Sequence, residues 1–247
     1  NIRGSMKVIV FGDIHGRDIW KQIVNTEKWD VVIFLGDYFT SRDGISEDDQ
    51  IANFKEIMEF KALYPDHVIL LRGNHDTQAM GYYWAECHPA FRNAWTIDNR
   101  DVILDCTQWV YVIDNIVFSH AGITQKWFDN VKQAHPEVQT FDDINLIEPC
   151  ELFGFTPCKL SDYYGDSQTQ PCTWVRPACL TECGVPGYTY VVGHTRPKYI
   201  SNYKELCLRH IGSENWALID VWTCDNLPSE YLVIDTDKKE FIPIKIQ

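Results

Sequence analysis

Three continuous apolar runs in the first third of the chain are each separated from the next by a stretch with helical spacing. The runs are Val8–Phe11, within the expected strand Met6–Phe11, then Val31–Leu35 and Val68–Leu71, and the stretches between them are Asp18–Lys28 and Asp48–Leu63. Strands that are buried on both faces read as continuous apolar runs rather than as alternating ones. The order strand, helix, strand, helix, strand therefore predicts a parallel α/β sheet.

Each of these three runs is followed at once by a short polar cluster. The clusters are Gly12–Gly16 (GDIHG), Gly36–Tyr38 (GDY) and Gly73–Asp76 (GNHD). Open α/β sheets bind their ligands beyond the carboxyl ends of the strands. The sequence therefore predicts a functional site at this edge of the sheet.

The second half of the chain contains more expected strands, and two of them end in a histidine. The expected strands are Val102–Cys106, Trp109–Ile113, Ile116–Ser119, Tyr188–Val192, Ala217–Val221, Tyr231–Asp235 and Glu240–Ile246. The histidines lie in Ser119–Gly122 (SHAG) and Gly193–Thr195 (GHT). Between them, residues 126–186 are rich in Cys, Pro, Tyr and acidic residues with weak periodicity. Long irregular segments in compact domains are usually functional, so an insertion or cap bordering the site is expected here.

Five of the expected strands therefore end in residues that can bind a metal ion. The candidate ligands are Asp13, His15, Asp37, Asn74, His120 and His194. Carboxylate, imidazole and amide groups suit manganese, iron or zinc, and they do not form a thiolate site. Each residue alone has an ordinary structural explanation, such as a helix cap or a buried histidine. Their joint placement at strand ends favours a metal centre.

These motifs occur in the order found in calcineurin-like metallophosphoesterases. The chain resembles the serine/threonine phosphoprotein phosphatase branch of that superfamily and its bacterial and phage relatives, which include symmetrical diadenosine tetraphosphatases. The resemblance covers most of residues 6–195. It implies an α/β sandwich of two mixed sheets flanked by helices, with a dimetal site at the carboxyl ends of the strands. Independently of the resemblance, α/β folds of this length commonly stay undivided, so residues 6–247 are expected to form a single domain. Residues 1–5 are interpreted as an expression-tag remnant.

The resemblance also assigns the six ligands to two ions. Asp13, His15 and Asp37 would hold the first ion, Asp37 would bridge to the second, and the remaining three would complete the second. Two such ions, about 3.5–4 Å apart, would supply a hydroxide for in-line attack on phosphorus. Manganese is the expected metal, with iron and zinc as alternatives.

Three further residues gain a catalytic role through the same resemblance. His75 would protonate the leaving oxygen, because imidazole titrates near neutral pH. Arg42 and Arg176 would clamp phosphate oxygens, because the guanidinium fork matches them. The competing interpretations are a structural turn for His75 and surface salt bridges for the two arginines.

One position departs from the family's pattern. Many phosphoprotein phosphatases have GDxxDRG, in which the second aspartate orients the catalytic histidine, whereas this chain reads GDYFTSRDG. Thr40 occupies the place of that aspartate, and the arginine is displaced by one residue. Either Asp43 folds back to pair with His75, or another group such as a backbone carbonyl orients it. Asp76 is expected to cap a turn rather than bind a metal.

The leading functional hypothesis is a phosphomonoesterase that acts on phosphoserine or phosphothreonine in proteins. The alternatives are a dinucleoside polyphosphate hydrolase or nucleotide phosphodiesterase, and a non-catalytic metal-binding scaffold. Diadenosine tetraphosphatases also lack the second aspartate, and the complete ligand set disfavours a scaffold. Fold alone does not fix a substrate. We expect residues 126–186 to determine the substrate, because they would form a wall of the substrate cleft. An open cleft would favour protein substrates, and a deep aromatic pocket would favour nucleotides.

Composition narrows the partners and the compartment. The formal net charge of −13 disfavours general binding to nucleic acids or membranes. Nine cysteines without an export signal indicate free thiols in the cytoplasm. Cys150, Cys158, Cys172, Cys179 and Cys183 form a second candidate zinc site, although their spacing contains no C-x-x-C pair. Nothing in the sequence indicates an oligomeric state.

Overall fold

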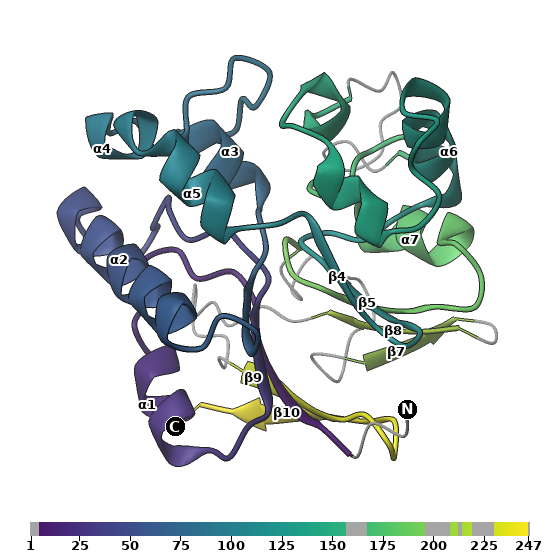
Figure 1. Ribbon diagram of the computed structural model, residues 1–247, viewed down its shortest axis with the longest axis horizontal. Coiled ribbons are helices and arrows are strands. Elements are labelled where there is room, and N and C mark those ends of the chain that lie inside the picture. The colour runs from purple at the N-terminus through teal and green to yellow at the C-terminus, as the bar shows by residue number, and fades with distance from the viewer. Residues whose placement is uncertain (1–4, 157–166, 196–207, 212–213, 219–229, 247) are drawn as a thin grey trace.

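The protein folds into two five-stranded sheets with helices on their outer sides. The computed structural model describes residues 5–156, 167–195, 208–211, 214–218 and 230–246. Figure 1 shows α1 (Trp20–Thr26) and α2 (Glu47–Leu63) on one side of the sheets, and α6 (Gln125–Ala134) and α7 (Pro177–Cys183) on the other. No helix within the described ranges is long and apolar enough to cross a membrane.

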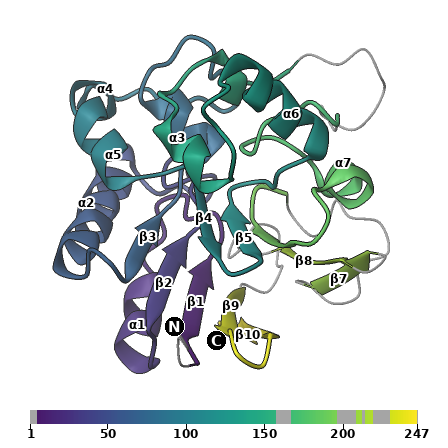
Figure 2. The same cartoon turned by 45° about the vertical axis from the view of Figure 1, so that its right-hand side comes forward.

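The first sheet has the order β10-β9-β1-β2-β3. Its strands are β1 (Lys7–Phe11), β2 (Val31–Phe34), β3 (Val68–Leu70), β9 (Glu230–Asp235) and β10 (Glu240–Lys245). The three strands nearest the amino terminus, β1, β2 and β3, are parallel, as predicted. Strand β9 pairs antiparallel with β1, and β10 pairs antiparallel with β9. Figure 2 shows β1 between β2 and β9, so the last part of the chain closes the sheet beside the first strand.

The second sheet has the order β4-β5-β6-β8-β7. Its strands are β4 (Val110–Ile113), β5 (Ile116–Ser119), β6 (Thr189–Val192), β7 (Leu208–Ile211) and β8 (Glu214–Leu218). The pairs β5–β6 and β6–β8 are parallel, and the outer strands β4 and β7 are antiparallel. Both sheets are mixed, which confirms the predicted sandwich. The last part of the expected strand Ala217–Val221, residues 219–221, lies outside the described residues.

The predicted strand Val102–Cys106 is wrong, because these residues belong to helix α5 (Arg100–Cys106). Ile103 is fully buried while Val102 is 52% exposed, which is the one-sided burial of a short surface helix. A short apolar run fits a strand and a helix equally well, so periodicity could not separate them. The other helices of this region are α3 (Asn74–Ala79) and α4 (Ala94–Asp98).

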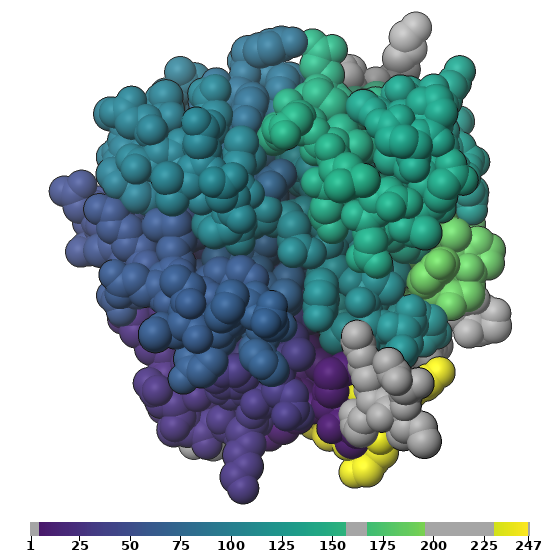
Figure 3. All heavy atoms as spheres, in the orientation of Figure 1, coloured from purple at the N-terminus to yellow at the C-terminus, as the bar shows by residue number. Residues whose placement is uncertain are grey.

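The segment of residues 126–186 builds one outer layer of the molecule over the second sheet. Besides α6 and α7 it contains two 3₁₀ helices, η1 (Asp142–Leu146) and η2 (Glu151–Phe153). Trp127 and Phe153 pack with Trp109 and Tyr190 in a second hydrophobic cluster. In Figure 3 the teal surface of the α6 region and the blue surface of the α3–α5 region meet along a shallow furrow. That the segment is an insertion within a single domain stays a prediction, and residues 157–166 of it are outside the described part.

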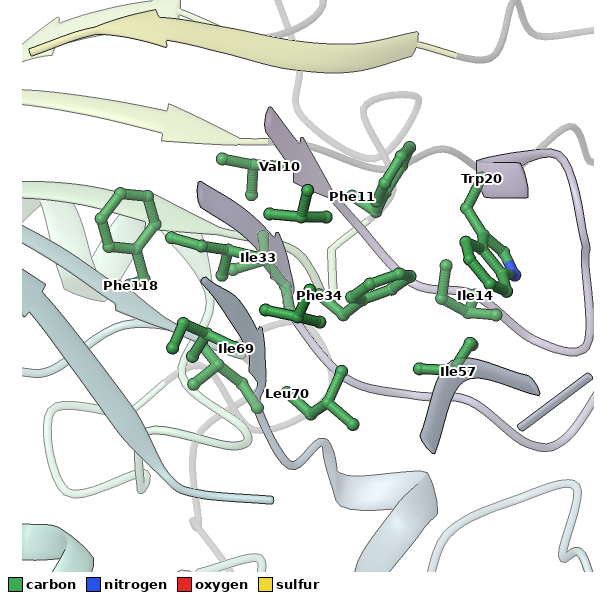
Figure 4. Packing of buried hydrophobic residues seen from close by; sticks show 14 of the residues in the cluster. Val10, Phe11, Ile14, Trp20, Ile33, Phe34, Ile57, Ile69, Leu70 and Phe118 are labelled. Atoms are coloured by element: carbon green, nitrogen blue, oxygen red, sulfur yellow. The ribbon is translucent and has the colours of Figure 1, made fainter. Parts of the chain in front are cut away.

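The main core lies between the two sheets and beneath α1 and α2. Figure 4 shows Ile33 and Ile69 pointing toward Phe118 of β5, whereas Phe34 points the opposite way toward Trp20 of α1. The rings of Trp20 and Phe34 meet edge to face with centroids 5.7 Å apart. Side chains on both faces of the first sheet are therefore buried, which explains the continuous apolar runs in the sequence. This packing fixes the strand ends that carry the candidate site.

Candidate metal centre

The six predicted metal ligands lie at the ends of strands from both sheets. Asp13 and His15 follow β1, Asp37 follows β2, and Asn74 opens α3, the next helix after β3. The last two ligands, His120 and His194, follow the parallel strands β5 and β6 of the second sheet. Residues up to 181 positions apart in the sequence come into contact here, since the His194 backbone N–H donates to the Asp13 carboxylate at 2.9 Å. Each ligand is buried or partly buried.

The carboxylate of Asp37 belongs to two groups of side chains that could each hold an ion. One group is Asp13, His15 and Asp37, and the other is Asp37, His120 and His194. The ligand atoms within each group lie within 4.8 Å of one another. No other such group of His, Cys, Asp or Glu occurs among the described residues. A carboxylate has two oxygens, so one aspartate shared by two groups has the geometry of a bridge between two cations.

The histidine rings are oriented with one nitrogen toward the common centre. Nδ1 of His15 lies 2.7 Å from the carbonyl oxygen of Phe39, and Nδ1 of His120 lies 2.8 Å from that of Leu35. A ring nitrogen that faces a backbone carbonyl carries the proton, so Nε2 is left with its lone pair, as in most metal-binding histidines. The arrangement prepares both imidazoles to act as ligands.

When each imidazole carries its proton only on Nδ1, acceptor atoms face one another at the centre, which is the condition that a cation satisfies. Nε2 of His120 lies 3.0 Å from Oδ1 of Asn74 and 3.3 Å from Oδ2 of Asp37. Nε2 of His194 is buried and has no hydrogen-bond partner in the described structure. Buried polar atoms are normally satisfied. The donor set therefore fits divalent metal ions that prefer oxygen and imidazole nitrogen.

Neighbouring charged groups outweigh burial in setting the pKa of Asp37 and that of His120. Burial raises the pKa of Asp37, but the imidazoles of His120, His75 and His15 outweigh it and hold the pKa far below its ordinary value. Burial lowers the pKa of His120, yet the carboxylates of Asp37 and Asp13 outweigh it and raise the pKa to about 9. In the metal-free protein a proton on His120 therefore occupies part of the space that a cation would take.

Several site residues have a backbone conformation that is rare outside glycine. The φ angles are 47° for His15, 54° for Asp37, 71° for Thr40 and 68° for His194. Such conformations cost about 1–3 kcal/mol each and persist only where surrounding contacts over-determine them. No pattern in the sequence predicts these left-handed conformations, which orient the ligand side chains toward the candidate site after the strands end.

Two glycines allow the loops after β2 and β3 to approach closely. Gly36 has φ 102°, and a Cβ atom there would lie 2.5 Å from the backbone nitrogen of Gly73. A Cβ atom on Gly73 would in turn collide with the Asp37 carboxylate. Neither position has room for a side chain, so the glycines of GDY and GNHD set the position of Asp37.

Asp76 ties these two loops together from beneath the metal ligands. Its carboxylate accepts hydrogen bonds from the backbone N–H groups of Gly73, Asp37 and Tyr38, each at 2.8 Å. The side chain is fully buried. Asp76 caps the start of α3, as the sequence indicated, and it also holds the loop that presents Asp37.

His75 has an unexpected partner in place of the family aspartate. Its Nδ1 atom lies 3.3 Å from the sulfur of Cys87. Within the described ranges, neither Asp43 nor a backbone carbonyl makes a hydrogen bond to the ring, and Asp43 accepts from Nε of Arg17 at 2.9 Å. Thr40 is buried, and its hydroxyl has no hydrogen-bond partner in the described part of the chain. Sequence reasoning missed Cys87, since nothing in its spacing links it to His75.

The two predicted phosphate-binding arginines are each associated with a different histidine of the candidate site. Nη2 of Arg42 donates to the carbonyl of His88 at 3.2 Å, and its positive charge helps burial to lower the pKa of His75 to about 4. Nη1 of Arg176 donates to the hydroxyl of Thr195 at 3.0 Å and to the carbonyl of His194 at 3.3 Å. The structure therefore brings both guanidinium groups close to candidate site histidines.

An aromatic row leads from the second ligand group toward the surface. The rings of Trp174 and His194 pack edge to face with centroids 5.4 Å apart, and the rings of Phe155 and Trp174 do so with centroids 5.1 Å apart. Trp174 is half-buried and Phe155 is 37% exposed. The predicted cysteine site, by contrast, does not form among the described cysteines, and Cys158 lies outside the described residues.

Comparison with known proteins gives a family match and more distant relatives. The sequence model of the calcineurin-like phosphoesterase family matches residues 6–203. The serine/threonine-protein phosphatase ppe1 of Schizosaccharomyces pombe is 33% identical over 153 residues, which cover 57% of this chain and 43% of that protein. The serine/threonine-protein phosphatase 6 catalytic subunit of Drosophila melanogaster is 30% identical over 156 residues, covering 58% of this chain and 45% of that one. The chain thus spans less than half the length of these relatives.

A solved structure supports the fold at lower identity. A serine/threonine protein phosphatase from Saccharomyces cerevisiae superposes with a TM-score of 0.61 at 15% identity, covering 100% of this chain and 81% of that one. At this identity the similarity extends to the fold alone.

Proposed function

The chain belongs to the calcineurin-like phosphoesterase family, and we propose that it is a phosphomonoesterase that removes phosphate from phosphoserine or phosphothreonine. The single observation that carries this proposal is the position of Asp37, whose carboxylate serves two clusters of potential ligands at once. A phosphoester hydrolase with a dimetal centre needs such a shared carboxylate. The serine/threonine phosphatase relatives support the choice of substrate.

In this proposal Asp13, His15 and Asp37 hold one ion, and Asp37, Asn74, His120 and His194 hold the other. Two bound divalent ions supply positive charge for the phosphate and a nucleophile at neutral pH. We favour manganese, because the donors are hard oxygens and imidazoles without a thiolate.

The remaining roles fall to protein groups around the ions. His75 protonates the leaving oxygen, and Arg42 and Arg176 hold phosphate oxygens. Burial keeps the pKa of His75 low, at about 4 in the free protein. A phosphate dianion bound beside the ring favours the charged imidazolium and thus prepares the acid for the reaction.

Metal binding is expected to release a proton from His120. Its pKa of about 9 means that the ring is protonated at neutral pH without metal, and an ion at Nε2 must displace that proton. Affinity for Mn²⁺ should therefore increase by up to about tenfold per pH unit between pH 6.5 and 8. Titration calorimetry at pH 7.5 in two buffers of different ionisation enthalpy measures the released protons. Identical binding enthalpies in both buffers would argue against this linkage.

The aromatic row of Trp174 and Phe155 favours a second candidate function. Exposed aromatic rings beside a phosphate site can stack on a nucleobase. A dinucleoside polyphosphate hydrolase is therefore the alternative substrate assignment, and it uses the same metal centre. The missing second aspartate at Thr40 is compatible with it.

The first test compares substrates with the manganese-loaded protein. We expect hydrolysis of an aryl phosphomonoester over the matching diester, and of a phosphoserine peptide over diadenosine tetraphosphate. His75→Asn should lower kcat by about 10²–10³ while metal content stays unchanged, because general acid catalysis contributes about that much. A preference for diadenosine tetraphosphate would select the nucleotide function. Full metal occupancy without turnover of any substrate would instead support the scaffold hypothesis.

Two further expectations from the sequence stay predictions. One is a location in the cytoplasm, and the other is the absence of general nucleic-acid binding, which the net charge of −13 supports.

A further inference from the structure

The thiol of Cys87 is buried against the imidazole of His75 and has few other groups within reach. Only 5% of the residue is exposed. The sulfur lies 3.3 Å from Nδ1 of His75 and 3.7 Å from the carbonyl oxygen of Asn74. A thiol carries a single hydrogen, and the nearer acceptor is the ring nitrogen.

We propose that Cys87 positions the His75 ring for catalysis through the hydrogen bond between its sulfur and Nδ1, in the place of the aspartate that the family pattern has at Thr40. The inference rests on the proposed role of His75 as the acid. In the neutral ring the thiol donates to Nδ1 and the ring proton stays on Nε2. In the imidazolium, which is the acid, Nδ1–H donates to the sulfur, and Nε2–H lies on the opposite side of the ring from Cys87, where a leaving oxygen can receive its proton and leave the ring neutral.

Two residues of the loop after β2, Thr40 and Asp43, could orient His75 instead of Cys87, but the structure supports neither. The Thr40 side chain is buried, but its hydroxyl has no partner in the described ranges, so it does not orient His75. Asp43 pairs with Arg17 instead. The only hydrogen-bond partner of the His75 ring among the described residues is Cys87.

The loop that carries Cys87 is anchored on the same helix that carries His75. Gln78 of α3 clamps the far end of the loop, since its amide donates to the carbonyl of Phe91 at 3.0 Å and accepts from the Phe91 N–H at 2.7 Å. The Phe91 ring is buried and packs on Phe39 with centroids 5.1 Å apart. Sulfur and imidazole are thus held by one rigid unit, as a positioning contact requires.

The same loop also reaches the proposed phosphate-binding arginine. The carbonyl of His88, next to Cys87, accepts from Nη2 of Arg42 at 3.2 Å. In the family pattern, the loop after β2 supplies both the orienting aspartate and the arginine. Here the loop after β2 supplies only Arg42, displaced by one residue. The adjacent residues Cys87 and His88 lie in a different loop, and they contact His75 and Arg42 respectively.

The test measures how Cys87→Ala changes the dependence of kcat on the leaving group of the substrate. With the manganese-loaded protein, kcat and KM are measured for aryl phosphates ranging from a nitrophenyl to a methylphenyl leaving group. We expect kcat to fall about tenfold for the poorest leaving group and little for the best, with KM unchanged, because only poor leaving groups need a well-placed acid. The variant should add no further loss in a His75→Asn background.

Cys106→Ala is the matched control, because among the described residues this partly buried thiol donates only to the carbonyl of Ile103, away from His75. This variant should leave kcat and KM unchanged for every aryl phosphate of the series. Cys87→Ser keeps a donor at the same place and should recover most of the lost rate, which also covers the case in which Cys87→Ala fails to fold. An equal loss for every leaving group, or a further loss without His75, would overturn the proposal.

A second measurement is independent of turnover. Nuclear magnetic resonance of the histidine ring nitrogens in the zinc-loaded protein reports the His75 tautomer. We expect the Nε2–H form in the parent protein and a mixture in Cys87→Ala. The same tautomer populations in both would refute the role of Cys87, even if the proposed phosphatase activity itself were not found.

Discussion

Asp37→Asn is expected to abolish tight binding of the second metal ion and to lower kcat/KM for an aryl phosphate by at least about 10³. Asparagine has the same size and can still accept the Asp37 hydrogen bond from the His75 N–H, which is 2.9 Å long. It offers one neutral oxygen where the carboxylate offers two charged ones, so it cannot bridge two cations. Loss of several kcal/mol of charge stabilisation corresponds to a rate loss of roughly this size.

Metal content and activity of the same preparation check this prediction. Elemental analysis after dialysis against Mn²⁺ should find about two ions per chain in the parent protein, and fewer in the variant. Asp43→Asn is the control, because Asp43 lies in the same loop but pairs with Arg17 near the surface. Two ions per chain and an activity within tenfold of the parent protein in Asp37→Asn would contradict a bridging role.

The convergence of the candidate ligands could be predicted from the sequence because it depends on a simple rule of sheet geometry. The carboxyl ends of parallel strands meet at one edge, so Asp13 and Asp37 must lie close together once β1 and β2 are recognised. The approach of His120 across the two sheets came only from motif order and family resemblance. Its Nδ1 contact with Leu35 spans 85 residues, which no local pattern encodes.

What the sequence could not predict depends on tertiary contacts or on local turn geometry. The left-handed conformation of Asp37 and His15 is enforced by neighbouring loops, since neither residue type requires it. The contact between Cys87 and His75 depends on where the loop folds back, which the Gln78 clamp decides. The apolar residues Val102–Cys106 predict a strand but belong to the helix Arg100–Cys106, because packing on one side rather than apolar content selects the element.

Asp76→Ala is expected to destabilise the metal-free protein by about 3–5 kcal/mol. The substitution leaves three buried N–H groups without an acceptor, and each unsatisfied group costs about 1–3 kcal/mol. These groups belong to Gly73, Asp37 and Tyr38, so the loss acts at the junction of the two loops that present Asp37. Urea denaturation in the presence of a chelator measures the free energy of unfolding without any contribution from bound metal.

Asp143→Ala separates the effect of burial from the loss of the hydrogen bonds themselves. Asp143 also accepts three hydrogen bonds, from the backbone N–H groups of Gln139 and Thr140 and from the Thr140 hydroxyl, but it does so near the surface. Water can replace the carboxylate there, so the loss should be much smaller than for Asp76→Ala. Equal losses in the two variants would show that Asp76 acts only as an ordinary cap. A larger loss for Asp76, together with weaker Mn²⁺ binding, would mean that the loop carrying Asp37 depends on this buried carboxylate, as the three shared N–H groups require.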